Sequence, residues 1–447
     1  MKRKLTTVLT VALAAGMMMT GCGSSNSGTE TKESAATAAA DSTAADTTAA
    51  AAKSGEVTTI RFYGSDSEYN QNIVAGFQAE NPDIKVEIVP VDFDNAEQVI
   101  KTGIASGDPV DVSFFWGSQI NAFTEDNMAY DLTPYLTENN NEWKDIFVPA
   151  YIDAGMVDGK YYAVSYQPVI ETIFYNKDLF AAAGLDPEDP PSTIEELNEA
   201  AEKLTIMDGN TYKQVGFIPW LNAGKPIYTW GWNFGGDFYD ADTNTLTVAK
   251  AENIEALQWE VDFAEKFGGK SFIEFANGLG SGAQDAFVTG QVAMAVRGNF
   301  DIANMAQYNP DLNYGICPIP SKVEGEHATW AGGWAFVIPR GAKNQELSMD
   351  FMKYMLSDEA QTVMAQDSAS FSPRKSVSEA VFGSDDKYKA FLDYIETAKI
   401  RPPVPVGQLL WDNLNQVLDS ALNGKDTPEN LMKALDVSIN EELKKLN

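Results

Sequence analysis

Hydrophobic and polar positions between residues 58 and 115 predict three strands separated by two helices. Residues 58–63 and 85–89 alternate with the two-residue period of a strand, and residues 110–115 form a short apolar run. Residues 69–80 and 94–106 carry apolar side chains at helical spacing. Strand, helix, strand, helix, strand at these lengths predicts a parallel, doubly wound sheet.

A similar mixture of helices and strands resumes further along the chain. Ser192, with Glu195 three residues later, predicts a capping box for a helix that runs to about Met207. The pattern also predicts helices at 253–267, 344–356 and 428–446 and short strands at 215–218, 292–296, 314–317 and 334–338. The body from Glu56 to Asn447 is too long for one ordinary core and fits two α/β lobes.

The N-terminus has the pattern of a secretory signal. Three basic residues, Lys2, Arg3 and Lys4, precede an apolar stretch from Leu5 to Met19 that is too short to span a bilayer. The sequence Met-Thr-Gly-Cys that ends at Cys22 resembles a bacterial lipobox, although Leu is commoner than Met at its first position. We therefore expect residues 1–21 to be a lipoprotein signal peptide and Cys22 to be lipidated, which would hold the protein to the membrane through its acyl chains.

Residues 22–55 read as a tether between that anchor and the body. They are almost entirely Gly, Ser, Thr, Ala and acidic residues, with no aromatic side chain. A segment of this composition cannot bury enough apolar surface to offset the entropy of ordering it. We expect it to be disordered and to let the body move above the membrane.

The charge balance and the few Cys and His residues exclude several classes of function. The chain has 64 acidic and 32 basic residues, so nucleic acid is excluded as a partner, while a cationic ligand such as a polyamine stays open. With Cys22 lipidated, Cys317 is alone and reads as a buried apolar residue. A single His, at position 327, argues against a His-rich metal site or a His-dependent triad, and no Gly-rich phosphate loop occurs. We expect no metal and no cofactor.

Several segments, taken in order, resemble the bacterial extracellular solute-binding proteins of the maltose-binding type, which serve ABC importers. The matching segments are 161–166, 173–185, 287–294, 332–339, 351–361 and 421–424. Their order and spacing extend over most of the body. The resemblance implies a sugar-binding protein that delivers its ligand to the permease subunits of an importer and catalyses nothing; we expect a monomer.

The same resemblance implies a type II periplasmic-binding-protein fold, with two doubly wound α/β lobes joined by three hinge crossings. By position, the crossings fall near 164–167, 318–321 and 371–374. The N-terminal lobe would then comprise 56–164 plus 321–372, and the C-terminal lobe 165–320 plus 373–447. Crossings of this kind allow two rigid bodies to rotate about a few backbone torsions.

Aromatic side chains are the first candidates for the ligand site, because sugars present C–H patches that stack on flat rings. Trp116 directly follows the strand at 110–115, at the strand end where open α/β sheets bind ligands. Trp230 and Trp232 lie in a segment rich in Gly and aromatic residues that we interpret as a binding loop, although one of the pair could be structural. Trp334 follows two Gly residues, and Tyr166 lies at the first expected crossing.

Four charged residues complete the candidate site. Asp66 and Glu68 follow the first strand, where carboxylates could accept hydrogen bonds from sugar hydroxyls, although solvated loop charges are the plain alternative. Arg297 follows an apolar strand, and Arg374 falls at the third expected crossing. Because an Arg can bind two hydroxyls or a carboxylate, uronate-bearing oligosaccharides stay open beside neutral ones.

Three rival functions remain at this stage. A secreted glycoside hydrolase or lyase is compatible with the many carboxylates. A polyamine-binding protein of the same fold would use the aromatic residues as a cation–π box. A surface adhesin would hold polymer without passing it to a permease.

Overall fold

The structure is a computed structural model, and it describes residues 57–91, 95–137, 146–221, 226–323 and 325–446. One mixed sheet of ten strands organises this part of the chain. The strand order is β2-β1-β3-β13-β6-β11-β8-β7, with β12 paired to β6 and β14 paired to β13. The strands of this sheet are β1 (Thr58–Gly64), β2 (Ile84–Pro90), β3 (Val112–Trp116), β6 (Val164–Asn176), β7 (Ile206–Asp208), β8 (Thr211–Phe217), β11 (Val292–Gly298), β12 (Tyr314–Cys317), β13 (Thr329–Val337) and β14 (Ala398–Lys399). The expected signal peptide, Cys22 and the tether lie outside the described residues.

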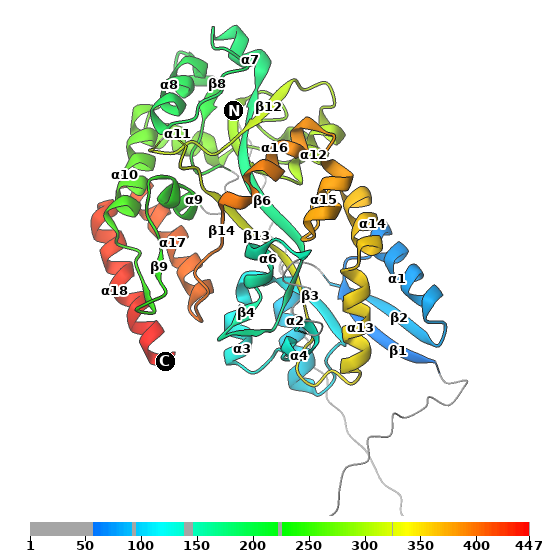
Figure 1. The fold of residues 1–447 in the computed structure, drawn as a ribbon. Coiled ribbons are helices and arrows are strands. Elements are labelled where there is room, and N and C mark those ends of the chain that lie inside the picture. The colour runs from blue at the N-terminus through cyan, green and yellow to red at the C-terminus, as the bar shows by residue number, and fades with distance from the viewer. Residues whose placement is uncertain (1–56, 92–94, 138–145, 222–225, 324, 447) are drawn as a thin grey trace, which may run out of the picture. The chain divides into compact units, whose positions relative to one another are not determined.

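The helices and two small ribbons surround this sheet (Figure 1). The ribbons pair β4 (Met156–Val157) with β5 (Lys160–Tyr161) and β9 (Tyr239–Asp240) with β10 (Thr245–Leu246). The α-helices are α1 (Glu68–Glu80), α2 (Ala96–Ser106), α3 (Ile120–Glu125), α4 (Thr133–Leu136), α6 (Pro149–Asp153), α7 (Lys177–Ala182), α8 (Ile194–Leu204), α9 (Pro226–Asn233), α10 (Ala251–Lys266), α11 (Lys270–Asn277), α12 (Asp301–Tyr308), α13 (Gln345–Met355), α14 (Asp358–Ser368), α15 (Lys375–Phe382), α16 (Asp386–Tyr394), α17 (Gly407–Leu422) and α18 (Pro428–Leu446). Short 3₁₀ turns are η2 (Gly117–Gln119), η3 (Gly282–Gln284) and η4 (Ile395–Thr397).

The first five predicted elements are confirmed as β1, α1, β2, α2 and β3, each within a few residues of the expected bounds. β1 lies between β2 and β3 and is parallel to both, as a doubly wound sheet requires. Ser67 caps α1 by accepting a hydrogen bond from the backbone N–H of Asn70, and Gly107 ends α2 with the positive φ of 74° that glycine adopts readily.

The predicted capping box of α8 is confirmed in kind but is displaced by one residue. Thr193, not Ser192, is the N-cap: its hydroxyl accepts from the N–H of Glu196, whose carboxylate accepts from the N–H of Thr193. The Ser192 hydroxyl and N–H also donate to that carboxylate. Glu196 thus satisfies three donors, and these hydrogen bonds hold the pKa of its carboxyl below the ordinary value.

The long strand β6 joins the two groups of strands in the sheet. Its residues from Val164 to Ile170 pair with β13, whereas those from Glu171 onward pair with β11 and β12 (Figure 1). The change of partner between Ile170 and Glu171 lies a few residues beyond the first expected crossing. The lobe boundaries expected from the sequence remain a prediction.

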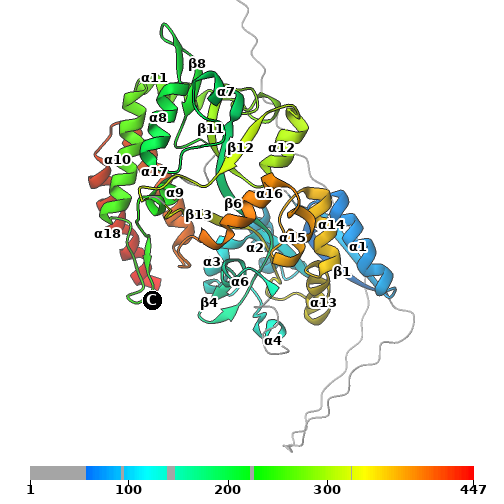
Figure 2. The same ribbon diagram turned by 45° about the horizontal axis from the view of Figure 1, so that its top comes forward.

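Separate hydrophobic clusters cover the two groups of strands. One packs β1, β3 and the start of β6 against α1, α13 and α14, with Phe62 and Phe351 in edge-to-face contact. Another packs β8 and β11 against α8 and α10. A third unites α9, α10, α17 and α18, and α17 and α18 lie side by side in both ribbon views (Figure 2).

Glu260 on α10 is a fully buried carboxyl group whose two oxygens have no hydrogen-bond partner. Burial raises its pKa well above the ordinary value of 4.5. Because the folded state then holds this proton more tightly than the unfolded state, Glu260 costs stability increasingly as the pH rises above about 4.5, until the raised folded pKa is passed.

We therefore expect Glu260→Gln to raise the melting temperature at pH 7–8 and to have a much smaller effect near pH 4. Thermal unfolding followed by circular dichroism over this pH range measures the difference. Glu265→Gln, on the exposed face of the same helix, should change stability little at either pH. A Glu260→Gln variant that is no more stable than the parent at pH 8 would show that the buried carboxyl is stabilised by contacts not seen in the structure.

Candidate binding cleft

Trp116, at the end of β3, forms a cluster with two tryptophans of β13. Its ring lies nearly parallel to that of Trp330, with centroids 6.1 Å apart, and meets Trp334 edge-to-face at 4.8 Å. Trp334 lies directly opposite Trp116 in the antiparallel pairing of β3 with β13. Trp330 is buried, whereas Trp116 and Trp334 are half-buried, so these two rings retain exposed surface.

Two glycines between the β13 tryptophans make this arrangement possible. A Cβ on Gly332 would meet the Trp330 ring at 2.3 Å, so only glycine lets that ring lie over the strand. Gly333 has a φ of 123°, and its Cβ would meet the carbonyl oxygen of Gln167 on β6 at 2.3 Å. The Gly-Gly pair therefore allows close approach of ring and backbone at the centre of the sheet.

A second aromatic group comes from α9 and α17. Tyr228 on α9 stacks against Trp411 on α17 with centroids 6.3 Å apart. The guanidinium of Arg401 lies 3.8 Å from the centroid of the Trp411 ring, a cation–π contact. Because α17 also packs against η2 and α3, these groups lie close to the segment that follows Trp116.

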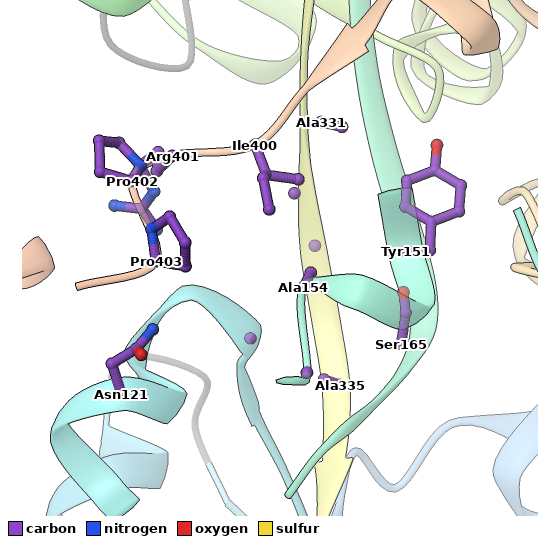
Figure 3. Close-up of a pocket in the computed structure, with 14 residues that line it drawn as sticks. Asn121, Tyr151, Ala154, Ser165, Ala331, Ala335, Ile400, Arg401, Pro402 and Pro403 are labelled. Atoms are coloured by element: carbon purple, nitrogen blue, oxygen red, sulfur yellow. The ribbon is translucent and has the colours of Figure 1, made fainter. Parts of the chain in front are cut away.

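Two cavities adjoin this region and share Asn121 and Pro403. The smaller, of about 50 Å³, is bounded by η2, α6, the glycines of β13 and the segment 400–403. Figure 3 shows Arg401, Pro402 and Pro403 on one side of β13 and Tyr151 and Ser165 on the other, with Asn121 below. The larger, of about 670 Å³, lies between residues of α3 and β4 and residues 239–244 and 403–405.

The smaller cavity is lined mostly by Gly, Ala and Pro residues, together with two buried side chains that have unpartnered donors, Arg401 and Tyr151. Arg401 is 7% exposed, and its Nη2 atom has no hydrogen-bond partner. Burial lowers the pKa of Arg401 to about 10, so it stays charged at neutral pH. The hydroxyl of Tyr151 is likewise buried and unpartnered, and burial raises its pKa. Buried donors without a protein partner are suited to a polar ligand or bound water.

Glu125 and Asp158 are the carboxylates that line the larger cavity. Burial, together with the charges of Asp126 and Asp158, raises the pKa of Glu125. Tyr162, Tyr239 and Asn244 lie beside them. This cavity thus combines aromatic faces with hydrogen-bond acceptors.

Asp66, Glu68 and Tyr166 lie together near the start of α1. Asp66 is exposed and accepts a hydrogen bond of 2.8 Å from the side chain of Gln71, and Glu68 is exposed as well. Tyr166 is buried, and its hydroxyl donates to the Asn70 side chain at 3.1 Å. None of these three expected site residues lines either of the two cavities, and neither do Trp116 and Trp334. Tyr166 instead ties β6 to α1.

Arg297 and Arg374 are both occupied by carboxylates away from the two cavities. Arg297 is buried between Asp285 and Asp301, 3.0 Å from the latter, and burial raises the pKa of Asp301 although the Arg297 charge opposes that rise. Arg374 pairs with Asp358 at 2.6 Å and donates to the carbonyl of Leu356. In this structure their charges are already paired, so neither presents a free fork to a ligand in the cleft.

The aromatic segment around Trp230 is helix α9, so its interpretation as a loop was wrong. Trp230 is fully buried between β8 and α10, and its indole N–H donates to the carbonyl of Pro219 at 3.0 Å. Trp232 is buried in the other cluster, against Tyr228 and Phe238. A helix buried on all sides has no polar face, and for that reason its sequence lacks the amphipathic period that identifies a surface helix.

Three residues of the cleft were missed from the sequence: Trp330, Arg401 and Trp411. Trp411 occurs at helical spacing with apolar neighbours, which reads as core. Trp330 precedes the Ala-Gly-Gly-Trp run and lies on the same strand face as Trp334, a spacing of four that could have identified it. Arg401 precedes two prolines and carries no local signal of burial.

The mixed sheet with its long shared strand, and the cavities beside that strand, define the type II periplasmic-binding-protein class. The family model of the bacterial extracellular solute-binding proteins matches residues 63–362, and the chain belongs to this family. The maltodextrin-binding protein MdxE of Bacillus subtilis is 26% identical over 396 residues, which are 84% of this chain and 87% of that protein.

Two further matches agree with this assignment. A maltooligosaccharide ABC transporter solute-binding lipoprotein of Streptococcus pneumoniae is 25% identical over 282 residues, covering 60% of this chain and 62% of that protein. The solved structure of CpMnBP1 with mannobiose bound superposes with a TM-score of 0.75 at 26% identity, covering 86% of this chain and 99% of that one. The family and these matches are binding proteins and not enzymes.

Within the part of the chain that the structure describes, no helix is both long and apolar enough to cross a bilayer. The same residues contain no group of three or more His, Cys, Asp or Glu side chains placed to hold a metal ion. Cys317 is buried as a free thiol, in agreement with its interpretation as an apolar residue.

Proposed function

We propose that this protein is the carbohydrate-binding lipoprotein of an ABC importer, and that it captures a mono- or oligosaccharide in the cleft bounded by Trp116, Trp411 and Arg401. The observation that carries the proposal is the smaller cavity, which Arg401 helps to line while its guanidinium contacts Trp411, and which begins at Gly117, directly after Trp116. Sugars need this combination, because their rings stack on aromatic faces while their oxygens take up directed hydrogen bonds.

The relatives support a sugar as the ligand class. Two of them are named for maltodextrin and maltooligosaccharide, and a solved structure of similar fold holds mannobiose. A polyamine is a poorer candidate, because the buried guanidinium of Arg401 would repel a cation in the smaller cavity. Glu125 and Asp158 are a pair of carboxylates such as a hydrolase uses, but the family is one of binding proteins.

The proposed anchor is a lipidated Cys22 that follows a signal peptide of residues 1–21, with residues 22–55 as the tether. The lipobox-like sequence before Cys22 supports it, as does the naming of the Streptococcus pneumoniae relative as a lipoprotein. The protein would then act as a monomer outside the cell, near the permease subunits to which it passes its sugar.

In the proposed mechanism the ligand bridges two lobes and stabilises a closed form that the permease recognises. The lobes would comprise 56–164 plus 321–372 and 165–320 plus 373–447, with crossings near 164–167, 318–321 and 371–374. The partner exchange along β6 supports the first of these crossings, because a change in its twist would reorient the strands on either side. A ligand favours closure only to the extent that it binds the closed form more tightly.

A thermal-shift screen of the purified protein against defined mono- and oligosaccharides tests this function. We expect at least one sugar to raise the melting temperature. At a ligand concentration one hundred times its Kd, binding adds about 2.7 kcal/mol to the free energy of unfolding. Small-angle scattering at saturation with that sugar should show compaction, and chromatography should recover the sugar unchanged. Steady product formation would favour a hydrolase, and a shift with spermidine alone would favour the polyamine alternative.

A further inference from the structure

Arg401 is a buried cation whose Nη2 atom has no hydrogen-bond partner, in an otherwise strongly acidic protein. The sequence carries a formal net charge of −32, yet none of the described residues lining the smaller cavity is an Asp or Glu. Asp412 is the acidic residue whose charge acts on Arg401, but it is exposed and accepts a hydrogen bond from Gln408. A buried charge without a directly bound counter-ion is costly, which points to a partner supplied by the ligand.

The stacking of Arg401 leaves its hydrogen-bonding edge free. The guanidinium face lies over the Trp411 ring, and this contact does not use the N–H groups in the guanidinium plane. Nη2 is buried without a partner. Burial raises the pKa of the neighbouring Tyr228 hydroxyl, so it stays protonated, and it too has no partner. A planar fork held rigidly in this way matches the geometry of a carboxylate.

We propose that the sugar this protein binds carries a carboxylate, as a uronic acid residue does, and that Arg401 binds this group in the smaller cavity. This inference rests on the proposed function and narrows its ligand class. Arg401 is the charged residue among those that line the cavity, and none of the lining residues is a carboxylate that could pair with it. A neutral sugar presents hydroxyls, which carry no charge to offset the guanidinium.

The sizes of the two cavities fit a ligand whose carboxylate lies in the smaller cavity and whose sugar rings lie in the larger one. The smaller, of about 50 Å³, can hold a carboxylate but is well below the roughly 300 Å³ at which ligand pockets begin. The larger, of about 670 Å³, can hold sugar rings, and it offers Glu125, Asp158 and two tyrosines as hydroxyl acceptors and ring faces. The two cavities share Asn121 and Pro403 in their walls, so they are neighbours, and the proposal places one ligand across both.

Calorimetric titration of the full chain with matched sugar pairs tests the inference. The pairs are digalacturonate with galactobiose and dimannuronate with mannobiose. We expect at least one acidic disaccharide to bind at least about tenfold more tightly than its neutral counterpart. If neutral disaccharides bind as tightly as the acidic ones or better, the inference fails while the proposed function stands; if no sugar of the thermal-shift screen binds, the proposed function fails as well.

Variants of Arg401 separate charge recognition from support of Trp411. Arg401→Met should weaken binding of the acidic sugar by about 10- to 100-fold and that of the neutral one by a clearly smaller factor. Arg401→Lys should recover part of this loss, because it keeps the charge but not the planar fork. The exposed Arg340 provides the matched control, since Arg340→Met removes the same charge from the protein surface. Equal losses for acidic and neutral sugars would show that Arg401 only positions Trp411, and would overturn the inference.

Discussion

Replacing Trp230 with alanine should destabilise the protein by about 3–5 kcal/mol while leaving the ligand affinity of the folded molecules unchanged. Trp230 is fully buried, and its ring meets Phe217 and Trp259 edge-to-face. The variant leaves a large cavity between β8 and α10, and the carbonyl of Pro219 loses its donor. Structural burial thus predicts a loss of stability, whereas the sequence pattern alone had placed this residue at the ligand.

Urea unfolding followed by tryptophan fluorescence and circular dichroism measures the change in stability, and titration of the same variant at low temperature measures its affinity. Trp230→Phe, which keeps an aromatic ring but loses the indole N–H, should lose less stability than the alanine variant. A Trp230→Ala protein that unfolds like the parent but binds sugar many times more weakly would return Trp230 to the binding site.

The second large effect is expected at Trp116, where alanine should weaken sugar binding by about 2 kcal/mol, or about 30-fold. The half-buried Trp116 ring covers Trp330 and meets Trp334, so its removal takes away a stacking face that is held in a fixed orientation. Because part of Trp116 is already exposed, the loss of stability should be smaller than for Trp230.

Trp259 supplies the matched control for Trp116. It is also half-buried, but it lies on α10, where its indole N–H donates to the Asn198 side chain at 3.0 Å, and it packs against a different hydrophobic cluster from Trp116. Trp259→Ala should therefore lower stability and leave affinity intact, the opposite of Trp116→Ala. Unchanged sugar affinity in Trp116→Ala, measured by calorimetry, would remove this residue from the proposed site.

The alternation of short-period and helical patterns was enough to predict the β1-α1-β2-α2-β3 unit, because those elements are amphipathic and separated by turn residues. The one-residue displacement of the α8 cap has a local cause: Ser192 and Thr193 both have hydroxyls that can cap, and only backbone conformation decides between them. Helix α9 was not predicted, because tertiary contacts bury Tyr228, Trp230 and Trp232 on different sides of it.

Some residues of the candidate site could likewise be predicted from the sequence, and others could not. The position of Trp116 could be predicted, because ligands of open α/β sheets bind beyond the carboxyl ends of strands, and whether Trp116 contacts the ligand stays a prediction. Arg401 could not be found, since its place depends on the pairing of β14 with the start of β13, whose residues lie far apart in the sequence. Arg297 and Arg374 read as free charges because their carboxylate partners are recognisable only in three dimensions.

The strand β6 has a mechanical consequence for any motion between the groups of strands on its two sides. Both of its halves are fully engaged in hydrogen-bonded ladders, one with β13 and the other with β11 and β12. A rotation between these groups can therefore be taken up as added torsion near Ile170 and Glu171, with every ladder kept intact. Resistance to such a rotation would then be elastic and would rise smoothly with the angle of rotation. The strand would act as a spring that returns the protein to its resting geometry once the force that rotates the two groups is removed.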